Sequence, residues 1–223
     1  MEHTLKSFDQ ALDGLLAATV RMAEKVHMMV SDAGRAILSG DSELARQVVE
    51  HDLAVDRDFE AIRAQCLAIL ARFHPVARDL RQVMAMEHSS GDLERAADHA
   101  KGMAKRVIAG LGADISDEAR GQFSRLHKAV VGAIEDATDA LVRRDPELAQ
   151  KVVRDDRQID AIHDDLFHLV VAAAKRPSAG VSADVHLLFA AKSLERIGDH
   201  ATNVAEEAMF MSEGAAPSAT RKE

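Results

Sequence analysis

The stretch LERIGDHATNVAE, residues 194–206, places acidic and amide side chains beside an apolar seam. Glu195, Asp199 and Asn203 recur every four residues, so they lie one turn apart on one face of a helix. A related stretch, LERAADHAKGMAK, occupies residues 93–105 and repeats the Glu-x-x-x-Asp spacing. This recurrence indicates a duplicated helical unit with one acidic pair in each half.

A second pair of segments supports the duplication. GDSELARQVVEHDLAVD, residues 40–56, aligns without gaps to RDPELAQKVVRDDRQID, residues 144–160. The second and fifth helical segments are therefore copies, as are the third and sixth. By elimination the first and fourth are also copies, although their sequences barely show it. The sequence predicts an all-α protein of six long helices that form two tandem three-helix bundles.

Residues that break helices are few and well spaced, and they divide the chain into six long pieces. We expect helices at residues 3–38, 42–72, 76–109, 116–143, 146–175 and 182–211. The domains predicted from these cuts are a first bundle at residues 1–112, a second at 113–212, and a loose tail at 213–223.

Capping residues and apolar spacing agree with these cuts. Asp41, Ser116 and Asp145 each precede a predicted helix and can accept hydrogen bonds from its first N–H groups. In the last two segments apolar residues follow alternating steps of three and four, which is typical of long helices packed in a bundle. The seam residues are Leu148, Val152, Ile159, Ile162, Leu166, Leu169 and Ala173 in the fifth segment, and Leu187, Ala190, Leu194, Ile197, Ala201, Val204, Ala208 and Met211 in the sixth.

Composition and charge exclude several classes of function. The 223 residues carry a net charge of −9, with 3% aromatic residues and neither Trp nor Tyr. An acidic surface repels phosphate backbones, and no aromatic residues are interleaved with basic ones to stack on bases, so nucleic acid is not an expected partner. A lone cysteine, no signal-peptide pattern and no long apolar run predict a cytoplasmic protein that reaches a membrane only through its partners.

The repeated acids suggest a cation site. Asp52, Asp56 and Glu60 are spaced by four in the second segment, as are Asp156, Asp160 and Asp164 in the fifth. If neighbouring helices align these stripes with the Glu-x-x-x-Asp pairs, several carboxylates face one region, and a hard cation would offset their repulsion.

Two other interpretations of the acids stay open. One is a solvated acidic face, and the other is a set of interhelical salt bridges with Arg57, Arg95, Arg157 or Arg196. The isolated Glu24-x-x-His27 pattern is half of a di-iron motif, and we interpret it as incidental. No nucleophile lies in a pattern with a base, and Cys66 among apolar residues is expected to be buried and inert, so no enzymatic activity is predicted.

The motifs quoted above resemble those of the PhoU family of bacterial phosphate-uptake regulators. The resemblance extends from about Phe8 to Met211 and includes PVARDLR, residues 75–81, at the start of the third segment. It implies two three-helix bundles, a homodimer, and a non-enzymatic negative regulator of phosphate uptake, of the phosphate regulon and of cellular phosphate homeostasis. The implied partners are the ATPase subunit of a phosphate ABC importer and the sensor histidine kinase of the phosphate two-component system, at the inner face of the plasma membrane.

The resemblance also implies a multinuclear metal cluster, with iron the first choice and Zn, Mn, Mg or Ca as others. The ligands carried over by the motifs are Asp52, Asp56, Glu94 and Asp98 in the first half and Asp156, Asp160, Glu195 and Asp199 in the second. The first copy departs from the motif, because Gly102 stands where the second has Asn203 and Ala96-Ala97 replace Ile197-Gly198. The second site is therefore the closer match. The alternative functions are a metal-binding helical bundle with a storage or redox role, and a scaffold whose acids only form salt bridges.

Overall fold

The computed structural model describes residues 2–111, 115–174 and 181–213, and it contains six long α-helices there. Each described helix end lies within two residues of the position expected from the sequence. The helices are α1 (Glu2–Ser39), α2 (Ser42–Phe73), α3 (Ala77–Ile108), α4 (Asp117–Arg143), α5 (Pro146–Ala174) and α6 (Val181–Glu213).

The predicted caps are present. The side chains of Asp41 and Asp145 accept backbone N–H groups of α2 and α5 at 2.9–3.1 Å, and Ser116 caps α4 at 3.3 Å. At the other ends, His74 and Arg144 close α2 and α4 in the left-handed conformation, with φ of 47° and 55°. Local chemistry therefore sets the limits of these helices, as expected.

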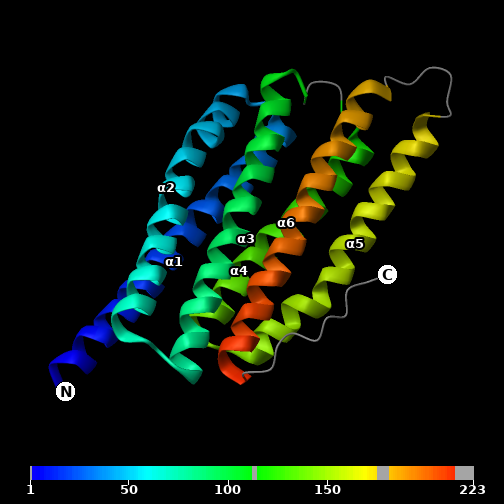
Figure 1. Ribbon diagram of the computed structural model, residues 1–223. Helices are drawn as coiled ribbons and strands as arrows, with labels where there is room; N and C mark the ends of the chain where they lie inside the picture. The colour runs from blue at the N-terminus through cyan, green and yellow to red at the C-terminus, as the bar shows by residue number, and fades with distance from the viewer. Residues whose placement is uncertain (1, 112–114, 175–180, 214–223) are drawn as a thin grey trace.

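The six helices lie side by side with their long axes roughly aligned (Figure 1). Helices α1–α3 pack on one another to form the first bundle, and α4–α6 form the second. The bundles meet where α3 packs along α6 and α1 packs on α4. Each half therefore uses its first and third helices to contact the other half.

One hydrophobic core extends through both bundles. Every predicted seam residue of α6 is buried. In α5 the seam residues from Val152 to Leu166 are buried, and those nearer the two ends of the helix are partly exposed. The α6 seam is more deeply buried because this helix packs against α3, α4 and α5 at once, whereas α5 packs only against α4 and α6. The two bundles therefore share one hydrophobic core.

The predicted division between residues 112 and 113 stays a prediction, since residues 112–114 lie outside the described residues. The predicted tail, 213–223, also lies outside them apart from Glu213, the last residue of α6. Among the helices that are described, none is both long enough and apolar enough to cross a bilayer.

Candidate functional site: two acid clusters and the seam between the bundles

We call Asp52, Asp56, Glu94 and Asp98 the first acid cluster. It lies between α2 and α3, and Asp52 is its most buried member, with a side chain 3% exposed. Lys101 of α3 donates to Asp52 Oδ2 at 2.5 Å and to Asp98 Oδ1 at 3.3 Å. The ammonium group therefore joins a buried carboxylate of α2 to an exposed one of α3.

The charges of the cluster act on two of its members, Asp56 and Glu94. Burial raises the pKa of Asp56, and the charge of Asp52 raises it further. Burial also raises the pKa of Glu94, followed by the charges of Asp98 and Asp56. The hydrogen bond to Asp52 raises the pKa of Lys101. The acids of α2 and α3 thus share one electrostatic environment, with Lys101 as its cation.

The second acid cluster comprises Asp156, Asp160, Glu195 and Asp199, on α5 and α6. Burial raises the pKa of Asp199, followed by the charges of Glu195 and, more weakly, Asp160. Asp156 Oδ1 faces the backbone of α6, because a Cβ atom added to Gly198 would lie 3.9 Å from it. The acids of this half therefore also gather along one helix pair.

The cations beside the second acid cluster differ from Lys101. Lys192 Nζ lies 2.6 Å from Glu195 Oε2, and Arg196 Nη1 lies 3.8 Å from Asp199 Oδ2. These side chains are 49% and 55% exposed, whereas Lys101 is 26% exposed. Pairs between residues three apart on one helix surface are weak and easily exchanged.

The acids of the two clusters are the predicted metal ligands. Within the described residues, 2–111, 115–174 and 181–213, no group of three His, Cys, Asp or Glu side chains is arranged to hold a metal ion. In the first acid cluster an ammonium contacts one oxygen of the buried carboxylate, so a metal bound at Asp52 Oδ2 would have to displace Lys101. In the second acid cluster, a metal ion bound by Glu195 would have to displace the ammonium of Lys192 from its carboxylate. Of the arginines predicted to form salt bridges with these acids, Arg196 pairs with Asp199, but within α6 and at 3.8 Å. In the first acid cluster the bridge between helices is made by Lys101 and Asp52.

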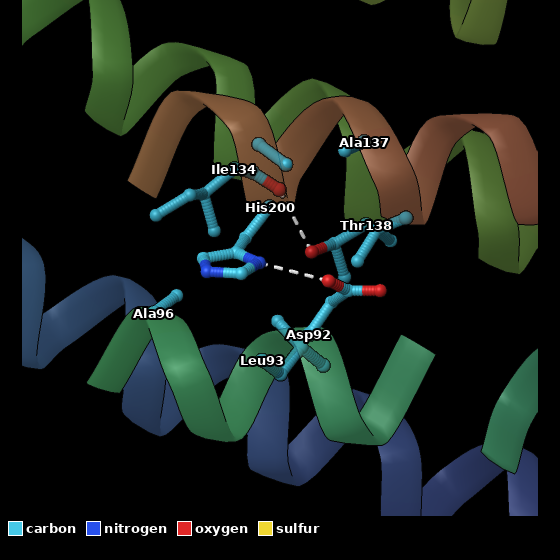
Figure 2. A pocket seen from close by; sticks show the side chains of 9 residues that line it. Asp92, Leu93, Ala96, Ile134, Ala137, Thr138 and His200 are labelled. Carbon is cyan, nitrogen blue, oxygen red and sulfur yellow. Dashed lines mark hydrogen bonds and ion pairs between the residues drawn. The ribbon is translucent and has the colours of Figure 1, made fainter. Parts of the chain in front are cut away.

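The α3–α6 seam, the row of polar residues where the two bundles meet, holds a further group that the sequence did not predict. Asp92 of α3 accepts hydrogen bonds from Asn203 Nδ2 and pairs with His200 Nδ1, both at 2.8 Å from Oδ1. Figure 2 shows His200 extending from α6 toward Asp92, beside Thr138 of α4. The His99 ring stacks on His200 at 5.7 Å, and burial lowers the pKa of His99. These residues join α3 to α6 where the two bundles meet.

The seam continues into a cleft of about 490 Å³ between α2, α3 and α6. His88 Nδ1 lies 3.0 Å from Glu207 Oε1 at its edge. Burial raises the pKa of both Glu206 and Glu207, and the charge of Glu207 raises that of Glu206 further. The cleft carries acids from both bundles and so depends on how the bundles dock.

Cys66 is buried between α2 and α3, where burial raises the pKa of its thiol to about 11. At neutral pH the thiol is therefore protonated, which agrees with the prediction of an inert cysteine.

Differences between the two halves of the sequence point to Lys101 and Asp92, which were not predicted as site residues. Lys101 aligns with Thr202, so only the first copy places a basic residue three positions after its aspartate. Asp92 aligns with Ser193, so only the first copy places an acid at this position of the seam. Differences between copies, more than their similarity, mark these residues.

Known proteins share both the sequence and the fold. The PhoU domain model matches residues 19–107 and 123–208. A relative from Rhizobium meliloti, described as a phosphate-specific transport system accessory protein PhoU homolog, is 34% identical over 98% of this chain and 92% of its own length. A relative from Zymomonas mobilis with the same description is 37% identical over 95% of this chain and 89% of its own.

Solved structures agree. The crystal structure of PhoU from Pseudomonas aeruginosa superposes with a TM-score of 0.87 at 31% identity, covering 93% of this chain and 100% of that one. The phosphate transport system regulatory protein PhoU from Streptococcus pneumoniae gives a TM-score of 0.86 at 26% identity, over 94% and 99% of the chains. With six helices in two tandem PhoU domains and full-length relatives above 30% identity, the chain belongs to the PhoU family.

Proposed function

We propose that the protein is a non-enzymatic negative regulator of phosphate uptake and of the genes that respond to phosphate starvation. The observation that carries the proposal is the match of both halves, over nearly the whole chain, to relatives described as accessory proteins of phosphate-specific transport. Since these relatives are described as accessory proteins, binding is the activity that we assign to the chain.

The proposed mode of action is that of an adaptor. The chain binds the ATPase subunit of a phosphate ABC importer and the sensor histidine kinase of the phosphate response, as a homodimer on the cytoplasmic side of the membrane. The outer face of α2 supports this, since Leu53 and Leu67 are 61% and 67% exposed and lie about four turns apart. Single exposed leucines are common on protein surfaces, but two on one helix face give a partner protein two apolar side chains to bury.

Deletion of the gene in its own host tests the proposal. We expect alkaline phosphatase activity to become constitutive in phosphate-rich medium, and a chromosomal copy of the wild-type gene to restore repression. Deleting the sensor kinase as well should return the activity to a low level, which shows that the signal passes through the kinase. Unchanged repression in the single deletion would rule the proposal out.

Metal binding remains a proposal for the second acid cluster alone. Its support is that Lys192 and Arg196 are half-exposed and can leave Glu195 and Asp199 at little cost. A bound divalent ion would supply positive charge between α5 and α6 and so stabilise their packing. No observation favours a storage or redox role over the regulatory one.

A further inference from the structure

The first acid cluster contains the most deeply buried carboxylate that is paired with a lysine in the described part of the chain. Asp52 is 2% exposed, and its Oδ2 atom accepts a hydrogen bond from Lys101. Its Oδ1 atom is buried without a hydrogen-bond partner among the described residues. A carboxylate in such a position requires a positive charge nearby, because burial removes the water that would otherwise solvate it.

Lys101 meets this requirement from within the protein. Its ammonium lies between a carboxylate of α2 and one of α3, so it holds the two helices together across the cluster. A divalent ion ligated by Asp52 would lie roughly 2–2.6 Å from the carboxylate oxygen. The ammonium of Lys101 already lies 2.5 Å from Asp52 Oδ2, so it would repel such an ion and compete with it for the carboxylate. The lysine and a metal are therefore alternative counterions for Asp52.

The second half of the chain has the same acids without this lysine. Asp52 aligns with Asp156, and Lys101 aligns with Thr202. Glu195 and Asp199 of the second acid cluster pair instead with half-exposed residues of α6 itself, one turn away. Asp98 and its counterpart Asp199 are thus paired with different cations in the two halves.

We infer that Lys101 is a built-in counterion that takes the place of a bound metal in the first acid cluster, so that the first bundle keeps its structure without metal. The inference does not depend on the proposed regulatory function, because it concerns what binds between α2 and α3.

The test compares metal binding by full-length variants after exhaustive treatment with a chelator. We expect Lys101→Met to bind about one additional Mn²⁺ ion per chain by titration calorimetry and elemental analysis. Its Tm should rise by roughly 5 °C or more in a hundredfold excess of Mn²⁺ over the dissociation constant. The matched control is Lys105→Met, an exposed lysine one turn further along α3, which should behave as wild type.

Two further variants separate metal binding from folding. Asp52→Asn with Lys101→Met removes the buried pair as a unit, and we expect it to fold and to bind no additional Mn²⁺. Placing each variant in a Glu195→Gln, Asp199→Asn background removes any contribution from the second acid cluster.

The inference is wrong if Asp52→Asn alone lowers the metal content of the otherwise wild-type chain, because the first cluster would then hold metal beside Lys101. It is equally wrong if folded Lys101→Met binds no more Mn²⁺ than Lys105→Met. If Lys101→Met fails to fold even in Mn²⁺, the comparison of wild type with Asp52→Asn decides, and equal metal content supports the inference.

Discussion

Gly34 of α1 has no side chain, which lets α4 pack closely against α1. A Cβ atom at Gly34 would lie 2.3 Å from Cδ2 of His127, well inside van der Waals contact. The His127 ring is buried, and its Nε2 atom lies 3.2 Å from the carbonyl oxygen of Val30, a contact that requires the proton on Nε2. The ring therefore occupies the space that any other residue at 34 would need.

We predict that Gly34→Ala destabilises the protein by about 2 kcal/mol, or roughly 4–8 °C in Tm. Alanine favours the helix by about 1 kcal/mol, but displacing a buried, hydrogen-bonded ring outweighs that gain. Thermal unfolding followed by circular dichroism measures the change.

Gly14, an exposed glycine of the same helix, is the matched control. A Cβ atom there meets nothing within 4 Å, so Gly14→Ala should raise stability by about 0.5–1 kcal/mol. If both substitutions stabilise the protein equally, the packing role assigned to Gly34 is incorrect.

At the scale of the helix, the start of α4 depends on α6 as well as on its own cap. Ser116 Oγ accepts from Ala119 N at 3.3 Å, and its N–H and O–H groups in turn donate to Asp184 at 3.0 and 2.9 Å. Asp184 is 7% exposed. The cap of α4 is therefore oriented by a buried carboxylate from the first turn of α6.

We expect Asp184→Ala to lower the free energy of unfolding by about 1–3 kcal/mol, because it leaves two donors of Ser116 unpaired. Asp41→Ala, at a cap made within one segment and exposed to solvent, should cost about 1 kcal/mol. Urea denaturation provides both values. Since Ser116 and Asp184 act together, the double alanine variant should lose less than the sum of the single losses, and strict additivity would contradict the coupling.

At the scale of the whole molecule, docking of the two bundles brings acids together along the α3–α6 seam. Burial raises the pKa of Glu206, and the charges of Glu207, Asp92 and Asp156 raise it further. Glu207 and Asp156 belong to the second bundle, and docking of the first bundle adds the charge of Asp92 from α3. The charged form of Glu206 therefore opposes folding at neutral pH.

We predict that Glu206→Gln stabilises the protein at pH 7 by about 0.5 kcal/mol, or roughly 1–2 °C. The folded-state pKa is raised, so as pH falls the folded side chain binds its proton before the unfolded one does. The advantage of glutamine is complete above the folded pKa, declines as pH falls through it, and is lost below the unfolded value of about 4.3. Thermal melts from pH 4 to pH 8 measure it.

Glu50→Gln, at an exposed position of α2, is the control and should change Tm little at any pH in this range. A stabilisation by Glu206→Gln that stays constant down to pH 4 would show that the seam charges are not its cause.

The sequence by itself determined the features that depend on neighbours along the chain. The apolar stripe of α6, buried from Leu187 to Met211, followed from a repeat of three and four residues. Asp41, Asp145 and Ser116 marked the starts of helices. The duplication revealed the two bundles, and the motif LERIGDHATNVAE pointed to the family. Helical periodicity and capping involve residues within a few positions of one another, so they are visible in the sequence.

Only the tertiary structure decided which charges meet. Lys101 reaches Asp52 across 49 positions of the chain, and His200 reaches Asp92 across 108, and no local pattern encodes either contact. The shared core and the close approach of His127 to Gly34 likewise depend on how the bundles dock. The sequence predicts which face of a helix carries the acids. Which cation lies against them depends on side chains that packing brings from other helices or from neighbouring turns, and so on the fold as a whole.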